Sequence, residues 1–202
     1  ITLGSAARIN CDAGTLTLSN ASSVTGTNNA LTLGGASNIT VSGTLGLGTA
    51  ALNKDGAGTA TLAVANTYTG NTNISNGALV PSVANAFGTS GTINITSTGT
   101  LQLQNAMTFA RPINLGSVGN SNVGGIRLIS SNVTLSGLIT LTATARINSD
   151  ANTLTFNNAN AFTGTNQTIT LGGAGNIVFN RAITTTTGGL TKDGAGTATL
   201  NV

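Results

Sequence analysis

The chain has 202 residues with a formal net charge of +3, and only 5% of its residues are charged, against about 25% in an ordinary globular domain. Thr, Gly and Asn together fill roughly 45% of the chain, far above average usage, whereas His, Trp and Glu are absent. This composition excludes imidazole catalysis and histidine metal sites, and it disfavours helices because Thr, Asn and Gly are weak helix formers. It indicates an all-β, repetitive protein.

Charge and hydropathy exclude two classes of partner. The cations are scattered singly and the aromatic residues do not interleave with them, so no nucleic-acid partner is expected. No apolar run approaches the roughly 18 residues needed to span a bilayer, so we expect no transmembrane segment in this portion. The single cysteine, Cys11, has no partner for an intramolecular disulfide, and we interpret it as a small, partly buried side chain.

Short segments that alternate apolar and polar residues predict β-strands along the whole chain. In chain order they cover residues 15–19, 30–34, 38–43, 58–64, 92–96, 100–104, 125–130 and 132–137. Clusters of Gly, Asn and Ser predict turns at 26–29, 70–73 and 119–122.

Two or three such strands make a coil of roughly 20 residues, which predicts a right-handed parallel β-helix, or β-solenoid, of about ten coils. Like side chains then stack above like, so that Asn rows hydrogen-bond along the stack and Thr rows form flat faces. The alternative is an array of immunoglobulin-like sandwiches, but these have repeats near 100 residues and a Cys/Trp core.

An internal repeat organises the chain. Residues 1–64 align with residues 139–202 without a gap, with identity at about 37 of about 64 positions. The domains expected are therefore a full module at 1–138 and the first part of a second module at 139–202, joined in one continuous solenoid. We expect equivalent residues such as Arg8 and Arg146 to lie on one face of the rod, and different faces would argue against a solenoid.

The segment LNKDGAGTATLAVANTYTGNTNISNGAL carries a recognisable motif. It resembles the autotransporter-associated β-strand repeat, also called the passenger-associated transport repeat, found in very large bacterial surface proteins. The matching positions that we single out are Leu52, Lys54, Gly56, Gly58, Leu62, Asn66, Tyr68, Gly70 and Gly77, with a partial second copy at Lys192, Gly194, Gly196 and Leu200. The resemblance implies a structural role and an extracellular or outer-membrane-associated location, and it transfers no catalytic residue and no cofactor.

Acidic residues are the remaining candidates for chemistry. The four carboxylates are Asp12, Asp55, Asp150 and Asp193, two pairs related by the repeat. A carbohydrate-active enzyme needs acids grouped with a further polar partner, and a calcium β-roll needs an Asp in each nonapeptide repeat. We therefore predict no catalytic residue and no metal site, and interpret these aspartates as turn residues that bond their own backbone.

The function predicted is a non-catalytic stalk or fibre segment for adhesion or surface coating. The alternative is a ligand-binding solenoid, in which Thr15–Thr17, Thr59–Thr61 and Thr153–Thr155 would form an ice-binding face, although they lie about two coils apart. Tyr68 and Phe87 could instead form a platform for glycans, but aromatic side chains mainly bury area. A carbohydrate-active β-helix enzyme is the weakest alternative.

Both ends of the chain, at residues 1–3 and 199–202, read as strand without a cap. An open solenoid end exposes unpaired backbone groups. The partners expected are therefore further copies of the same repeat, in one longer chain or in a head-to-tail filament, besides glycans or other cell surfaces.

Overall fold

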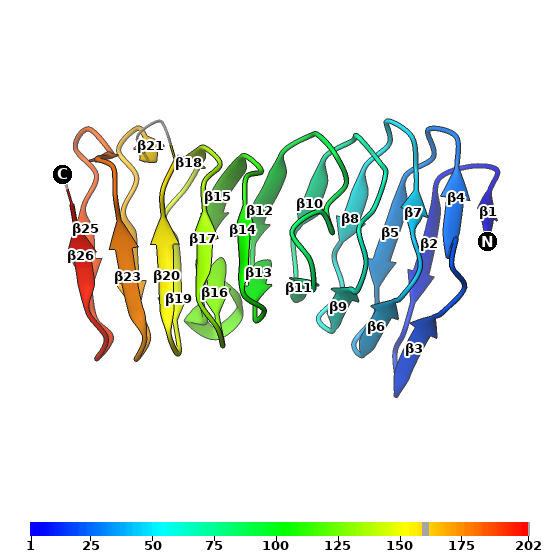
Figure 1. Ribbon diagram of the computed structural model, residues 1–202, viewed down its shortest axis with the longest axis horizontal. Helices are drawn as coiled ribbons and strands as arrows, with labels where there is room; N and C mark the ends of the chain where they lie inside the picture. Colours follow the sequence, from blue (N-terminus) through cyan, green and yellow to red (C-terminus); the bar gives the residue numbers. More distant parts are fainter. Residues whose placement is uncertain (159–161, 202) are drawn as a thin grey trace.

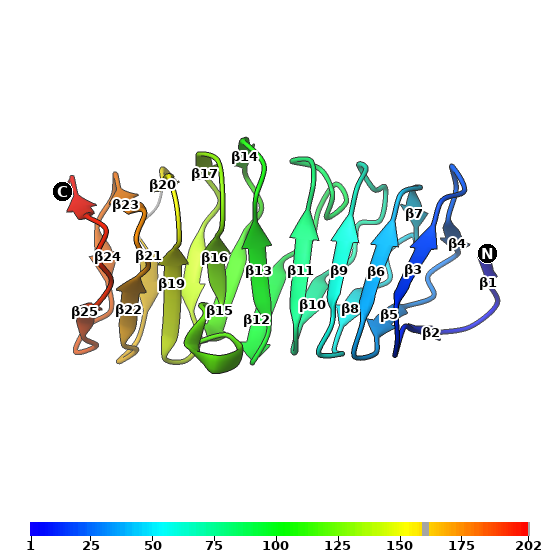
Figure 2. The same ribbon diagram turned by 90° about the horizontal axis from the view of Figure 1, so that it is seen from below.

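The computed structural model describes residues 1–158 and 162–201, and it is a β-solenoid (Figure 1). Its coils stack along one axis from the N-terminal to the C-terminal end, and the view from below shows the strands lying side by side across that axis (Figure 2). Every described strand pairing is parallel, as stacked coils require. The expected all-β solenoid is confirmed.

Two sheets run along the whole rod. The first, which we call sheet B, contains β2 (Ala7–Asn10), β5 (Leu31–Gly34), β8 (Leu52–Lys54), β10 (Thr72–Ile74), β12 (Ile93–Ser97), β15 (Ile113–Ser117), β18 (Ile139–Leu141), β21 (Phe162–Gly164) and β24 (Ile183–Thr184). The second, sheet C, contains β3 (Thr15–Leu18), β6 (Asn38–Val41), β9 (Thr59–Leu62), β11 (Ala78–Pro81), β13 (Thr100–Leu103), β16 (Ile126–Leu128), β19 (Ala145–Ser149), β22 (Ile169–Gly172) and β25 (Leu190–Lys192).

A third face completes each coil and has strands except in two successive coils. Sheet A contains β1 (Thr2–Leu3), β4 (Val24–Gly26) and β7 (Leu45–Gly46). Sheet D contains β14 (Met107–Phe109), β17 (Val133–Leu135), β20 (Thr153–Phe156), β23 (Asn176–Phe179) and β26 (Ala198–Leu200). Between them, residues 63–71 and 82–92 follow sheet C and precede sheet B without forming a strand.

The solenoid has nine coils, because sheets B and C have nine strands each. The expected ten coils were too many since the coils are longer than 20 residues on average. Ile93 pairs with Ile113, and Ile113 pairs with Ile139, so the coil length varies from about 20 to about 26 residues.

The eight predicted strands are all present, with boundaries shifted by a few residues. One predicted turn is partly wrong, because Thr72 and Asn73 of the 70–73 segment open β10. Thr72 faces inward and is fully buried, so a polar residue occupies a position that the alternation rule assigns to an apolar one.

Aliphatic side chains fill the interior. Along the strands, buried and half-buried residues alternate, as in β10, β15 and β17, because successive side chains point to opposite sides. The inward residues form one continuous core of Leu, Ile and Val. Phe rings add to it on the third face, such as Phe87 and Phe109 with centroids 5.4 Å apart. Among the described residues no helix is long enough or apolar enough to cross a bilayer.

The two repeat copies occupy different faces of the rod, contrary to our expectation. Arg8 lies in β2 of sheet B, whereas Arg146 lies in β19 of sheet C. The same displacement holds throughout: β1 of sheet A corresponds to β18 of sheet B, and β3 of sheet C corresponds to β20 of sheet D. The solenoid nevertheless stands, because the expectation of a single face assumed a whole number of coils per repeat.

Six coils and one further face separate β1 from β18. The additional third of a coil is gained in the part of the repeat after residue 62. There the chain crosses the third face twice, at 63–71 and 82–92, without forming a strand, so the sequence pattern does not reveal these crossings. One repeat therefore advances along the axis and also turns by about a third of a coil.

Candidate functional site

The motif residues lie where the third face lacks a strand, in the coils that contain β8 to β11. Leu52 and Leu62 point into the core and are 0% exposed. Leu52, for example, is packed between two neighbouring coils, because it pairs with Leu31 of the preceding coil and with Thr72 of the following coil. The two leucines are therefore ordinary core residues of the stack.

Lys54 is buried although it carries an amine. Its side chain is on the inward side of β8, and Nζ donates hydrogen bonds to the carbonyl oxygens of Gly56 and, at 3.1 Å, Asn76. The lysine thus closes the corner between sheets B and C in two successive coils. Burial lowers the pKa of Lys54 to about 8, with the charge of Asp55 opposing the shift and that of Arg8 adding to it.

Asn66 joins three coils where no strand does so. Its Oδ1 accepts a hydrogen bond from the Leu45 amide at 2.7 Å, and its Nδ2 donates to the Ala86 carbonyl at 2.5 Å. The side chain is 3% exposed, so these bonds are sheltered from water. The carboxamide takes over part of the ladder that a β-strand would provide.

Tyr68 and Phe87 do not form a glycan platform. Both rings are 0% exposed, and the Tyr68 hydroxyl is hydrogen-bonded to the Thr72 hydroxyl at 2.7 Å. Burial raises the pKa of Tyr68. The ring fills the interior of the coil whose third face has no strand, which explains why Thr72 is polar and buried.

The motif glycines lie against the backbone of the preceding coil. A Cβ on Gly56, Gly58 or Gly70 would overlap backbone atoms of Gly35, Ser37 or Ala50, respectively. Gly77 has a φ of +65°, and a Cβ there would overlap the Gly56 carbonyl. These positions permit the close stacking of corners.

The partial second copy repeats the stacking but not the burial. Leu190 and Leu200 are 46% and 43% exposed. Lys192 donates to the Gly194 carbonyl, as Lys54 donates to that of Gly56. Gly194 and Gly196 lie against the backbone of Gly173 and Gly175, as their counterparts do.

Asparagine side chains form a ladder on the outside of sheet B, as predicted. Asn73 donates to Asn53 at 2.8 Å, Asn94 to Asn73 at 2.8 Å, and Asn114 to Asn94 at 2.9 Å. These Nδ2–Oδ1 bonds follow the rod axis across β8, β10, β12 and β15. They tie four successive coils together without a charge.

The aspartates form ion pairs, which the sequence analysis missed. Asp55 accepts from Arg8 at 2.6 Å, and Asp193 accepts from Arg146 at 2.7 Å. Each arginine reaches across the intervening strand because a glycine, Gly34 or Gly172, leaves room there. The hydrogen bond with Asp55 raises the pKa of Arg8, and that with Arg146 lowers the pKa of Asp193.

The arginine clamp, defined as Arg8, Asn10, Gly34 and Asp55, recurs as Arg146, Asn148, Gly172 and Asp193. In each copy the arginine Nε also donates to the asparagine Oδ1, at 2.7 Å and 2.9 Å. The sequence contains a signal for this clamp, because the same four residue types recur at equivalent positions of the two repeat copies. Asp193 also bonds its own backbone, as expected. Asp55 does not: its Oδ2 is bound by Arg8 and its buried Oδ1 has no partner among the described residues.

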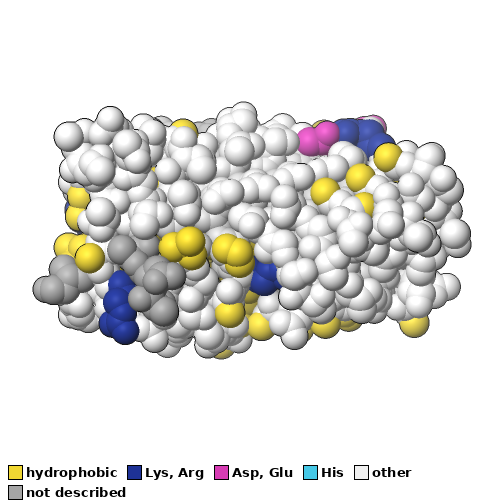
Figure 3. Space-filling model, turned by 90° about the horizontal axis from the view of Figure 1, so that it is seen from above, with side chains coloured by type: hydrophobic (Ala, Val, Ile, Leu, Met, Phe, Trp, Pro, Cys, Tyr) yellow, Lys and Arg dark blue, Asp and Glu magenta, His cyan; other side chains and the backbone are white. Residues whose placement is uncertain are grey.

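Of the other two aspartates, Asp150 accepts from Arg127 Nε at 2.6 Å, and Asp12 is exposed after β2. Within the described part of the chain, no three acidic, cysteine or histidine side chains gather as metal ligands would. Figure 3 shows a face with few charged side chains and small, separate apolar patches.

Cys11 occupies a turn position that a hydroxyl fills in the second copy. Its Sγ lies 3.4 Å from the Ala13 carbonyl, and the Oγ of Ser149 donates to the Ala151 carbonyl at 3.3 Å. Cys11 is 7% exposed and Ser149 is 0% exposed. The thiol therefore has a local structural role.

The threonines of the ice-binding alternative lie on the outside of two different sheets. In sheet C, Thr17, Thr40 and Thr61 are in register on three successive coils, so one column is uninterrupted. The neighbouring column, which begins at Thr15, is interrupted by Asn38. The column of Thr17, Thr40 and Thr61 ends at the next coil, where Val80 pairs with Thr61. Thr153 and Thr155 are in sheet D, so they do not extend this face.

One of the comparisons with known proteins gave a match, and it falls on the motif residues. Searches of curated proteins and of solved structures gave no match. Residues 52–80 match the model of a family described as the passenger-associated-transport-repeat. They are the segment that contains the buried side chains of Lys54, Asn66 and Tyr68, and this part of the chain is therefore similar to a passenger-associated-transport-repeat.

Proposed function

We propose that the chain is a non-catalytic stalk segment of the passenger region of a secreted or cell-surface bacterial protein. The observation that carries this proposal is the continuous ladder of nine coils, in which the passenger-associated repeat at 52–80 is an integral, buried part. Parallel pairing, an aliphatic core and an asparagine ladder resist bending and local opening.

The chemistry on the surface supports a structural role. Asp55, Asp150 and Asp193 are held by arginines, so they are not arranged as an acid and a base around a substrate. The partners that we propose are further copies of the repeat, stacked along the same axis. The repetition of residues 1–64 at 139–202 supports such stacking.

The test is immunogold labelling of intact cells of the source bacterium, with antibodies raised against residues 1–202. We expect gold outside the envelope, at a distance from the membrane that lengthens when a further 138-residue module is inserted. Gold found only after permeabilisation would contradict surface exposure. An unchanged distance after insertion would contradict the stalk.

One observation favours ice binding as a second candidate, namely the column of Thr17, Thr40 and Thr61. Thermal hysteresis of the purified chain tests it, with Thr40→Lys as the matched variant. Hysteresis that is lost in the variant would support this candidate, and background hysteresis would remove it.

A further inference from the structure

An insertion in one coil creates a hollow on the outside of sheet C. Leu101 of β13 pairs with Ile126 of β16, a step of about 25 residues where the neighbouring steps are shorter. The extra residues, 118–124, form a loop with a 3-10 turn, η1 (Asn120–Asn122), that leaves the coil and overhangs the sheet (Figure 2).

The loop is anchored at its base. Ser117 Oγ lies 2.9 and 2.8 Å from the Ser97 and Gly99 carbonyl oxygens, which share its one proton as acceptors, and it accepts from the Gly119 amide at 2.9 Å. Thr100 Oγ1 donates to the Gly124 carbonyl at 2.9 Å. Ser117 and Thr100 are both buried, so their hydrogen bonds hold the loop in a fixed position. The hollow is therefore already formed before a ligand binds.

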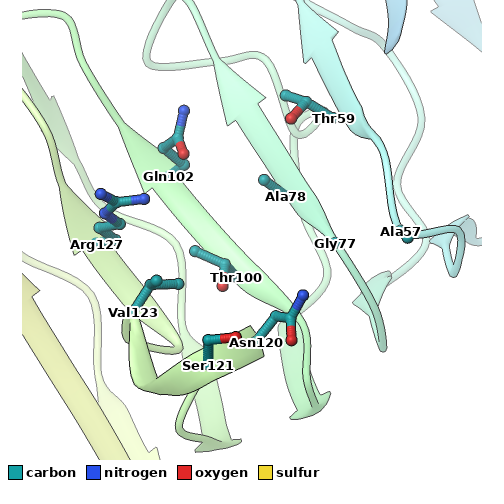
Figure 4. A pocket seen from close by; sticks show the side chains of 10 residues that line it. All are labelled: Ala57, Thr59, Gly77, Ala78, Thr100, Gln102, Asn120, Ser121, Val123 and Arg127. Carbon is teal, nitrogen blue, oxygen red and sulfur yellow. The ribbon is translucent and has the colours of Figure 1, made fainter. Parts of the chain in front are cut away.

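The hollow has a volume of about 280 Å³. Its lining consists of the small residues Gly77 and Ala78 at the start of β11, of side chains from β13 and β16, and of the loop. Figure 4 shows Asn120 and Ser121 at the loop edge, with Gln102 and Arg127 across the hollow from them.

The polar groups around the hollow are free to bind. Among the described residues, the side chains of Gln102, Asn120 and Ser121 have no hydrogen-bond or ion-pair partner, and Arg127 uses only its Nε, on Asp150 at 2.6 Å. Two carboxamides, a hydroxyl and two guanidinium Nη groups therefore offer both donors and acceptors at one place. By contrast, the side chains of Asn53, Asn73, Asn94 and Asn114 on sheet B are bonded to one another in the ladder.

The charge of the hollow indicates a neutral ligand. Arg127 is the one ionised side chain that lines it, and the carboxylate of Asp150 offsets its charge. A ligand that matches these groups carries several hydroxyls, each able to donate and accept, and small apolar patches for Val123 and Ala78. Sugar rings have this chemistry, and the volume suits one or two of them.

We propose that this hollow binds a neutral saccharide unit. One side of the hollow is lined by Ala57, Thr59, Gly77 and Ala78 of the passenger-associated repeat, whereas its free polar groups come from β13, β16 and the loop, so ligand binding would add recognition to the rod without altering the stack. Open geometry and the lack of an aromatic ring at the rim limit the affinity of one sugar to the millimolar range, about 10⁻³ M.

The test is a titration of the ¹⁵N-labelled 202-residue chain with galactose, glucose, mannose and N-acetylglucosamine, each to about 50 mM, followed by amide chemical shifts. We expect at least one sugar to give saturable shifts at Gln102, Asn120–Asn122 and Arg127. The double variant Gln102→Ala/Asn120→Ala should weaken that binding about tenfold or more, because two hydrogen bonds are lost.

Gln104→Ala is the matched control, because Gln104 follows β13 but does not line the hollow. The control should bind as the parent chain does. Ser121→Ala provides a second test if the double variant is misfolded, and it should also weaken binding. Absence of saturable shifts with all four sugars, shifts confined to other residues, or unchanged binding in the hollow variants would each overturn the proposal.

Discussion

Residues 1–64 and 139–202 are identical at about 37 of about 64 aligned positions, but equivalent strands lie on different faces of the rod. Their pairing registers are identical: Arg8 pairs with Thr32 as Arg146 pairs with Thr170, and Leu33 pairs with Lys54 as Leu171 pairs with Lys192. The comparison shows that the repeat specifies how one coil stacks on the next. It does not specify the face on which the stack begins.

The second difference between the copies is burial. Leu62 is 0% exposed and its counterpart Leu200 is 43% exposed, although each has the same preceding coil. Leu62 is covered by the following coil because β11 pairs with β9, whereas among the described strands β26, which contains Leu200, pairs only with the preceding β23. Burial of the motif is therefore supplied by the neighbour and not by the motif itself, as in other solenoids.

The largest expected effect sharpens this second difference. Leu62→Ala should lower the free energy of unfolding by about 3 kcal/mol, because it leaves a cavity in a packed core. Leu200→Ala should lower it by less than about 1 kcal/mol, because its site is already open to solvent. Urea unfolding of both variants, followed by circular dichroism, makes the comparison, and equal losses would contradict it.

Lys54 should make stability depend on pH. Its pKa of about 8 lies below the ordinary value of about 10.4 for an unfolded chain. The folded state therefore loses its proton first, and the free energy of unfolding should rise by about 2 kcal/mol between about pH 8 and pH 10.

Lys54→Met should abolish this rise, whereas the matched variant Lys192→Met should retain it because Lys192 is exposed. Urea midpoints at several pH values measure the difference. The lowered pKa of Lys54 would be contradicted if the free energy of unfolding of the parent chain fell between about pH 8 and pH 10 relative to that of Lys54→Met.

The two arginine clamps should differ in strength. Arg146 contacts both oxygens of Asp193 and its side chain is 16% exposed, whereas Arg8 contacts one oxygen of Asp55 and is 46% exposed. Arg146→Gln should therefore destabilise more than Arg8→Gln, and its effect should be less sensitive to salt. Thermal melts at low and high salt test the order, and the reverse order would show that local packing outweighs the ion pairs.

Cys11→Ser should have the smallest effect, below about 1 kcal/mol, because the second copy already places Ser149 at the equivalent turn with equivalent contacts. A melting temperature close to that of the parent chain is expected. A large loss would mean that the two turns are not equivalent.

Much of the fold follows from the sequence. Alternation predicted the strands, because it depends on neighbouring residues along the chain. The face was not predictable, since residues 63–71 and 82–92 complete coils without a strand pattern.

The site was only partly predictable. The motif positions were found from their resemblance to a family, but the buried state of Lys54 depends on carbonyl groups of the following coil, such as that of Asn76. The clamps were missed because Arg8 and Asp55 meet across a strand in which Gly34 has no side chain. The hollow depends on an overhanging loop whose direction no periodicity encodes.

Successive repeats are rotated by one face of the solenoid relative to each other, so that equivalent strands lie in different sheets. Disulfide trapping tests this rotation most directly. In a Cys11→Ser background, Asn114→Cys/Thr140→Cys should close a disulfide on oxidation, because these residues pair in β15 and β18. Asn114→Cys/Arg146→Cys should stay reduced, because Arg146 lies in sheet C. Mass spectrometry of the oxidised chains that found the second pair closed and the first pair open would contradict the account.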